Sequence, residues 1–170
     1  TGNRLLKMKK AIRKEFDTFL SRKVAKVVKK SSVPPSKQIL RSRFVLTIKE
    51  VWANLCSTEK MKARLVVLGF EDLRVLEGEV STDSPTVTRA GGRVLLQVAL
   101  SKKWPVWSAD ISSAFLQGDP LPEPVYAAIP PEAECEDDEV LEIYVCVYGL
   151  GDGPKKWNIK FTADQKKLGA

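Results

Sequence analysis

The 170-residue sequence predicts an α+β fold in which a mostly antiparallel sheet is flanked by helices. Apolar and polar residues alternate over 43–52, and a second apolar run follows over 61–70, which is typical of a β-hairpin. Apolar residues recur every three or four positions over 4–30, which indicates an amphipathic helix. With the elements below, the predicted order is helix, hairpin, helix, strand, helical turn, strand, strand and helix.

The first helix ends at the two prolines and three serines of SSVPPSK, and NLCSTEK is the expected turn of the hairpin. Residues 71–85 are polar and charged, which predicts an irregular loop. The later elements are expected as a helix over 86–104, a strand over 105–110, a helical turn over 112–116, strands over 125–131 and 140–150, and a helix over 151–167. We divide the chain into a basic helix with its linker (1–37) and a second domain (38–170).

The composition narrows the class of protein. At 44% hydrophobic residues the chain can bury a core, and no apolar run approaches the roughly 18 residues that cross a bilayer. We therefore expect an intracellular protein without a membrane partner. The sequence has no histidine, and its three cysteines show no C-x-x-C spacing, which argues against structural zinc and against a nucleophile activated by histidine.

Charge is distributed unevenly along the chain. Residues 1–64 hold 18 Lys/Arg and 4 Asp/Glu, a net charge of +14, whereas residues 65–170 hold 10 and 17, a net charge of −7. A basic segment of this kind attracts polyanions such as nucleic acids. A solvated helix face or a basic tail would give the same charge, so composition leaves both interpretations open.

Two cations in the hairpin share one face. Side chains alternate along a strand, so Lys62 and Arg64 point to the same side, opposite Ala63 and Leu65. Such a pair could bind phosphate groups, since arginine binds phosphate bidentately and lysine acts as a point charge. A basic, solvated sheet face is the alternative.

Asp110 lies at the end of the predicted strand, and after Ile111 it is followed by the small residues of SSAFL. The carboxylate could cap the helical turn over 112–116. It could also bind a divalent metal, because magnesium takes one or two carboxylates together with substrate phosphates and water. Ser112, Ser113 and Ala114 would then let a triphosphate approach the backbone closely.

Several motifs follow one another in a recognisable order: KARLVVLGF, TDSPTV, RVLLQVAL, SADISSAFLQGD, VY with PPE, and VYGL followed by P and W. In this order and spacing they resemble the reverse transcriptase domain of Ty1/copia-type retrotransposons, from about Arg43 to Trp157. The resemblance implies the fingers and the first part of the palm of an RNA-directed DNA polymerase.

The resemblance also implies roles for individual residues. Asp110 matches the first catalytic aspartate, which binds both ions of the two-metal mechanism, with the Ile111 carbonyl as a further ligand and Mg²⁺ (or Mn²⁺) as the cofactor. Phe115 would pack beneath the sugar of the nucleotide. The other nucleotide-binding residues implied are Lys62 and Arg64 on the phosphates, and Ser113 and Ala114 as backbone donors.

Two departures from the family pattern stand out. Asp152 occupies the place of a common glutamine, and we assign it to nucleotide binding with the others. The second carboxylate pair, Tyr-x-Asp-Asp, does not occur in these 170 residues, and the acidic run over 134–139 precedes VYGL and is expected to be a solvated loop.

The sequence therefore predicts a fragment of a retrotransposon Pol polyprotein, inactive alone, whose partners would be an RNA template, a DNA primer, a dNTP and the rest of the polyprotein. The family suggests a cytoplasmic particle or the nucleus as its location. One alternative is a non-catalytic, basic nucleic-acid-binding module or decaying remnant. Another is a partner-dependent or insoluble protein, because the apolar strand VLEIYVCV could be left as an unpaired edge.

Overall fold

The computed structural model describes residues 2–53 and 56–167 and confirms the α+β class. The helices are α1 (Gly2–Ser21), α2 (Leu73–Leu76), α3 (Arg89–Ser101) and α4 (Gly153–Lys167), with 3₁₀ turns η1 (Lys30–Ser32), η2 (Gly69–Glu71), η3 (Ala114–Gln117) and η4 (Pro131–Ala133). The strands are β1 (Ala25–Lys29), β2 (Ile39–Leu40), β3 (Ser42–Ala53), β4 (Cys56–Val67), β5 (Pro120–Ala128) and β6 (Glu139–Val145).

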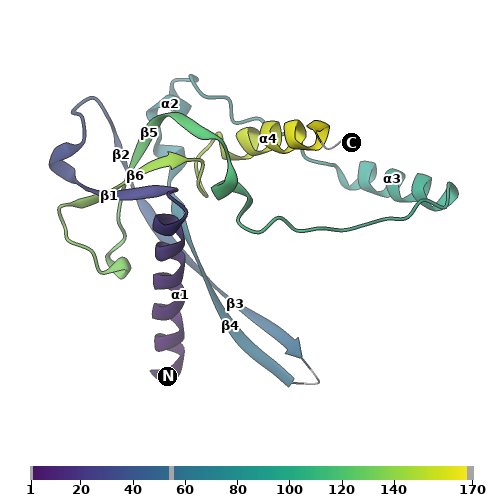
Figure 1. The fold of residues 1–170 in the computed structure, drawn as a ribbon, viewed down its shortest axis with the longest axis horizontal. Coiled ribbons are helices and arrows are strands. Elements are labelled where there is room, and N and C mark those ends of the chain that lie inside the picture. Colours follow the sequence, from purple (N-terminus) through teal and green to yellow (C-terminus); the bar gives the residue numbers. More distant parts are fainter. Residues whose placement is uncertain (1, 54–55, 168–170) are drawn as a thin grey trace.

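The strands form two sheets. The larger has the order β1-β6-β5-β2, and the smaller is the hairpin of β3 and β4 (Figure 1). Both neighbours of β6 are antiparallel to it, but β2 runs parallel to β5. The larger sheet is thus mixed, which qualifies the prediction of a mostly antiparallel sheet. Among the described helices, none is long and apolar enough to span a bilayer.

The predicted hairpin is confirmed, with longer strands than expected. Its register runs from Ser42 opposite Val67 to Ala53 opposite Cys56. Most of the segment NLCSTEK therefore belongs to β4, and its first two residues, 54–55, lie outside the described part. The second strand ends at Val67 rather than at residue 70, because the η2 turn begins at Gly69.

One hydrophobic core joins α1, the larger sheet and the base of the hairpin. Its members come from both sides of the boundary at residues 37/38, which itself stays a prediction. The largest of these fully buried side chains are Phe19, Leu40, Leu65, Leu141 and Ile143. Burying side chains of this size stabilises a fold by roughly 1.5–3 kcal/mol each.

The prediction that the first helix continues to Lys30 is wrong. The helix ends at Ser21, and Lys23 adopts a left-handed conformation with φ of 56°. The amides of Lys23 and Val24 then donate to the carbonyls of Leu20 and Phe19, which is the hydrogen-bond pattern of a Schellman cap. The chain reverses into β1, which pairs with β6.

The predicted strand over 105–110 is also wrong. This segment is extended and exposed, and the described residues provide no strand that pairs with it. It returns from α3, which lies apart from the sheets and is joined to the rest of the fold by two long connections (Figure 1). A strand needs a hydrogen-bonded neighbour, which local sequence cannot supply.

The two strands predicted over 125–131 and 140–150 are present with shifted bounds, as β5 and β6. Because β6 pairs with β1 on one side and β5 on the other, the expectation that VLEIYVCV forms an unpaired edge is wrong. The helix predicted over 151–167 is confirmed as α4.

Candidate nucleotide-binding site

The turn after Asp110 is held by a few local contacts. Ser113 adopts a left-handed conformation with φ of 54°, and its carbonyl accepts a hydrogen bond from the Leu116 amide. The Leu116 side chain is buried and anchors the η3 turn in the core. Ser113 rather than Asp110 is the N-cap residue of this turn, and it makes no side-chain cap, so the capping role considered for Asp110 is not observed.

Tyr148 brings the hairpin and this turn together. The guanidinium carbon of Arg64 lies 5.4 Å from the centre of the Tyr148 ring, a cation–π contact. The Phe115 ring meets the same tyrosine edge to face, with the ring centres 5.4 Å apart. Arg64 and Phe115, which the sequence assigned to nucleotide binding from two distant motifs, are therefore neighbours across one tyrosine.

The glycine after Tyr148 explains this position. The Tyr148 carbonyl accepts a hydrogen bond from the Val67 amide, and the Gly149 carbonyl accepts one from the Gly69 amide. Gly149 has φ of +94°, and a Cβ placed there would lie 1.9 Å from the Val67 carbonyl oxygen. The glycine of VYGL thus lets the chain dock on the end of β4, which fixes Tyr148 beside Arg64.

Lys62 and Arg64 belong to a larger cationic face. Residues on alternate positions of the two paired strands share one side of the hairpin. Over 43–49 and 60–66, this side holds no acidic residue and carries the cations Arg43, Lys49, Lys60, Lys62 and Arg64. The arrangement suits a ligand with several negative charges.

Glu15 of α1 lies near the edge of this face. Burial raises the pKa of its carboxyl, and a backbone hydrogen bond with Leu65 and the charges of Lys62 and Arg64 partly oppose the rise. The carboxyl group near Lys62 and Arg64 is therefore a half-buried one, and its burial disfavours the charged form that would neutralise these cations.

Asp110 and Ile111 lie in the exposed, extended segment before the turn. Their carboxylate and carbonyl oxygens are the hard donors that magnesium prefers. No cluster of three or more Asp, Glu, Cys or His side chains occurs within residues 2–53 and 56–167 that could enclose a metal. One carboxylate and one backbone carbonyl can supply two of the ligands of a single hard cation.

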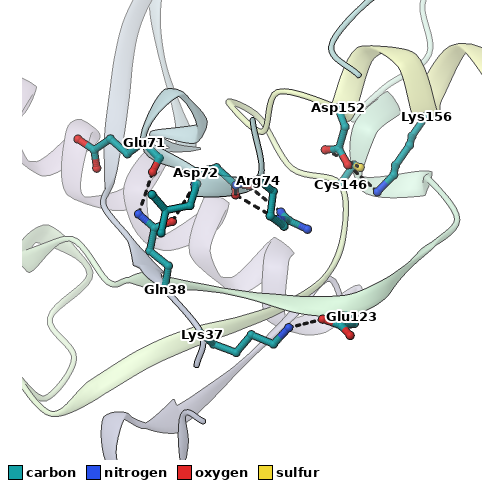
Figure 2. Close-up of polar contacts among 10 residues, drawn as sticks. Lys37, Gln38, Glu71, Asp72, Arg74, Glu123, Cys146, Asp152 and Lys156 are labelled. Carbon is teal, nitrogen blue, oxygen red and sulfur yellow. Dashed lines mark hydrogen bonds and ion pairs between the residues drawn. The ribbon is translucent and has the colours of Figure 1, made fainter. Parts of the chain in front are cut away.

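Asp152 lies in a different setting, on the turn that leads into α4 (Figure 2). It is buried, its Oδ2 atom lies 2.6 Å from the Lys156 Nζ atom, and the Cys146 Sγ atom lies 3.9 Å from its Oδ1 atom. Burial, followed by the charge of Asp152, raises the pKa of the Cys146 thiol to about 11. A groove of about 450 Å³ adjoins Asp152, Arg74 and Lys155, so a polar ligand could still approach.

The structure thus brings Arg64, Tyr148 and Phe115 together, keeps Lys62 on the same hairpin face as Arg64, and leaves Asp110 accessible. Ser113 and Ala114 belong to the turn that carries Phe115, whereas Asp152 is tied to Lys156. Sequence reasoning missed Tyr148 as a site residue, although the motif VYGL contains it and its glycine was the available signal.

The family comparison decides the class of the protein. The matching family is described as "Reverse transcriptase (RNA-dependent DNA polymerase)", and the match covers residues 23–169. The chain belongs to this reverse transcriptase family.

Three relatives of the reverse transcriptase domain are retrovirus-related Pol polyproteins of plant transposons. Those from transposons RE2 and RE1 of Arabidopsis thaliana are 33% and 32% identical over 129 and 130 residues, each alignment covering 75% of this chain and 9% of the relative. The one from transposon TNT 1-94 of Nicotiana tabacum is 30% identical over 159 residues, 92% of this chain and 11% of the relative. The resemblance to a copia-type reverse transcriptase is therefore confirmed.

This chain spans about a tenth of the length of these polyproteins. No solved structure shows a significant match to it.

Proposed function

We propose that this domain supplies the nucleotide-gripping part of an RNA-directed DNA polymerase centre, with the hairpin as the fingers and the residues from Asp110 onward as the first part of the palm. The contact of Arg64 and Phe115 with Tyr148 carries the proposal, because it joins the cationic hairpin face to the turn that follows Asp110. The family match and the Pol polyprotein relatives support the reaction class.

Each residue has a distinct role in the proposal. Lys62 and Arg64 bind the phosphates of the incoming dNTP, and Tyr148 holds the Arg64 guanidinium in place. Phe115 packs beneath the sugar, and the backbone of Ser113 and Ala114 faces the triphosphate. Asp152 is proposed to contribute from the neighbouring groove.

Asp110 and the Ile111 carbonyl would hold a divalent cation, Mg²⁺ or Mn²⁺, together with the triphosphate oxygens. When bound, the cation neutralises negative charge on the phosphates. The chain's own contribution is to place the lone carboxylate where solvent and nucleotide can reach it.

We further propose that the 170 residues alone do not synthesise DNA. A two-ion centre needs more carboxylate ligands than Asp110 supplies, and the sequence has no Tyr-x-Asp-Asp segment. The template RNA, the DNA primer and the rest of the Pol polyprotein are the partners that an active centre would require.

Binding of dATP to the isolated domain, measured by calorimetry with and without Mg²⁺, tests the nucleotide site. The parent protein should bind Mg·dATP, and the Asp110→Asn variant should lose the Mg²⁺-dependent part, since a neutral amide is a poor ligand for this ion. The Asp83→Asn variant removes a charge from another exposed position and serves as the matched control. Equal affinity of both variants would contradict the assignment of Asp110, and primer extension by the isolated domain would contradict its inactivity.

A further inference from the structure

Helix α1 carries a row of lysines on the side that faces solvent. Its packing face is marked by the buried residues Ile12, Phe16 and Phe19. With 3.6 residues per turn, Lys7, Lys10 and Lys14 fall on the opposite side of the helix, at successive turns. We call these three residues the lysine row; all three are exposed.

Other cations of α1 already have acidic partners. Arg4 pairs with Glu59 of β4, Lys9 pairs with Glu134, and Arg13 pairs with Asp17. The ion pairs found within the described residues include none of the three lysines of the row. Lys7 lies close enough to Glu59 for its charge to help lower the pKa of that carboxyl, but it forms no ion pair with it, so all three lysines can still contact an external ligand.

The placement of charge on α1 is unfavourable for the helix itself. Like charges spaced by three or four residues, as in Lys7/Lys10 and Lys10/Lys14, destabilise a helix. The first turn contains no acidic residue and the last turn contains no basic one, so the helix lacks the charges that its dipole favours at either end. A bound polyanion would relieve this repulsion, and the acidic residue beside Lys10 and Lys14, Asp17, is already paired with Arg13.

The lysine row is separate from the cationic face of the hairpin. The apolar side of the hairpin, with Ala63 and Leu65 buried, is the side on which α1 packs. By strand alternation, the hairpin's cations lie on the face opposite Ala63 and Leu65, and the lysine row lies on the side of α1 opposite its buried residues.

The dimensions of the row suit a nucleic-acid backbone. Seven residues of α-helix span about 10.5 Å, and the phosphates of one DNA strand follow each other at about 3.4 Å along the axis. The row thus matches roughly three phosphates. A membrane surface fits less well, since an interfacial helix inserts its apolar face, and here Ile12, Phe16 and Phe19 are buried in the protein.

We propose that the lysine row is a second nucleic-acid-binding surface, which holds the phosphate backbone at a distance from the nucleotide site. The proposal depends on α1 and its packing, and it stands whether or not Asp110 binds a nucleotide.

Fluorescence anisotropy with a labelled DNA duplex, measured over a range of salt concentrations, tests this surface. We compare the parent with Lys7→Gln/Lys10→Gln/Lys14→Gln and with a control of equal charge change, Lys30→Gln/Lys102→Gln/Lys166→Gln, whose lysines are exposed on other segments. Loss of three phosphate contacts should reduce the slope of log K against log salt by about 2 to 3 in the first variant only. Binding of Mg·dATP should not change in either variant.

Several outcomes would overturn the proposal. Equal losses of duplex affinity in both triple variants would show that only the net charge matters. Unchanged duplex binding by the Lys7/Lys10/Lys14 variant would show that the lysine row does not bind nucleic acid. Binding to phosphatidylserine vesicles that requires the row, with duplex binding unaffected, would assign it to a membrane. The Lys7→Arg/Lys10→Arg/Lys14→Arg variant should bind as the parent does, which separates lost charge from a damaged helix.

Discussion

Single glycines set the distance between the two halves of the candidate site. A Cβ on Gly69 would lie 2.2 Å from the Gly149 carbonyl oxygen, and a Cβ on Gly149 would lie 1.9 Å from that of Val67. Two backbone segments far apart in sequence thus approach more closely than any other residue type allows. Because Tyr148 precedes Gly149, this approach also fixes the aromatic ring that contacts Arg64 and Phe115.

Replacement of Gly149 by alanine should therefore be severely destabilising. We expect a loss of about 3 kcal/mol or more in the free energy of unfolding, measured with urea, because a forced backbone shift adds to the left-handed conformation. Gly78→Ala is the matched control: its φ is +75°, but open space surrounds it, so only the conformational cost of about 1 kcal/mol applies. Similar losses for the two variants would show that the close approach at Gly149 is not important.

Candidate site residues could be predicted from the sequence where they lie inside a recognisable motif. The alternation of MKARLVV placed Lys62 and Arg64 on one face, and the register confirms this. Tyr148 could not be predicted as their neighbour, because its position depends on how residues 147–151 dock on the end of β4. A local sequence pattern gives no information about contacts between segments that are far apart in the chain.

Helix α1 and strand β4 are joined by a titratable contact. Glu15 is half-buried, and burial raises the pKa of its carboxyl above the usual value. A raised carboxyl pKa in the folded state means that the fold binds the proton more tightly than the unfolded chain does. Its contribution to stability is thus present below the unfolded pKa and is lost as the pH rises through the folded pKa.

The Glu15→Gln variant should be more stable than the parent at pH 7, by an amount of order 0.5 kcal/mol in the free energy of unfolding. The amide oxygen of glutamine can still accept the hydrogen bond from the Leu65 backbone, and it places no charge in this half-buried position. The advantage should disappear as the pH falls below about 4, where the carboxyl is neutral. Thermal melting across this pH range measures both effects. The control is Asp17→Asn, which removes an exposed charge from the same helix. If Glu15→Gln showed no gain in stability that depends on pH, burial of the Glu15 carboxyl would not be what raises its pKa.

The end of α1 shows how tertiary pairing overrides a helical pattern. Apolar residues continue at helical spacing beyond Ser21, and no glycine marks the end, since the left-handed position holds Lys23. The β-branched pair in AKVVK was the sign of a strand. That sign is weak without β6, whose edge gives the segment its hydrogen bonds.

The molecule as a whole divides into a packed part and an exposed arm. In α3, Ala99 is the buried residue, whereas Leu95 and Leu100 are 64% and 73% exposed. The arm continues through the exposed residues Trp104, Val106 and Trp107 to Asp110, and the 89% exposure of Trp107 is unusual for so large a side chain. The insolubility or dependence on a partner that was expected from VLEIYVCV is therefore expected instead from the exposed apolar residues of this arm. Strand β6 itself is paired on both sides.

Hydrogen exchange should distinguish these two parts. Amides of residues 106–111 should exchange within seconds, because no backbone hydrogen bond protects them in the described structure, while those of β6 should exchange far more slowly. Mass spectrometry of peptides from both segments provides the measurement, with β6 as the internal reference. Strong protection of residues 106–111 would contradict the exposed arrangement and would indicate a pairing strand.

The sequence by itself determined the family, the hairpin and its cationic face, and the identity of the candidate residues, because these depend on motif order and on the two-residue period of a strand. Only the tertiary structure decided that residues 25–29 form a strand, that 105–110 do not, and that Tyr148 joins Arg64 to Phe115. The physical reason is the same in each case. Strand pairing and ring contacts need a partner from elsewhere in the chain, and the position of that partner follows from packing rather than from local propensity.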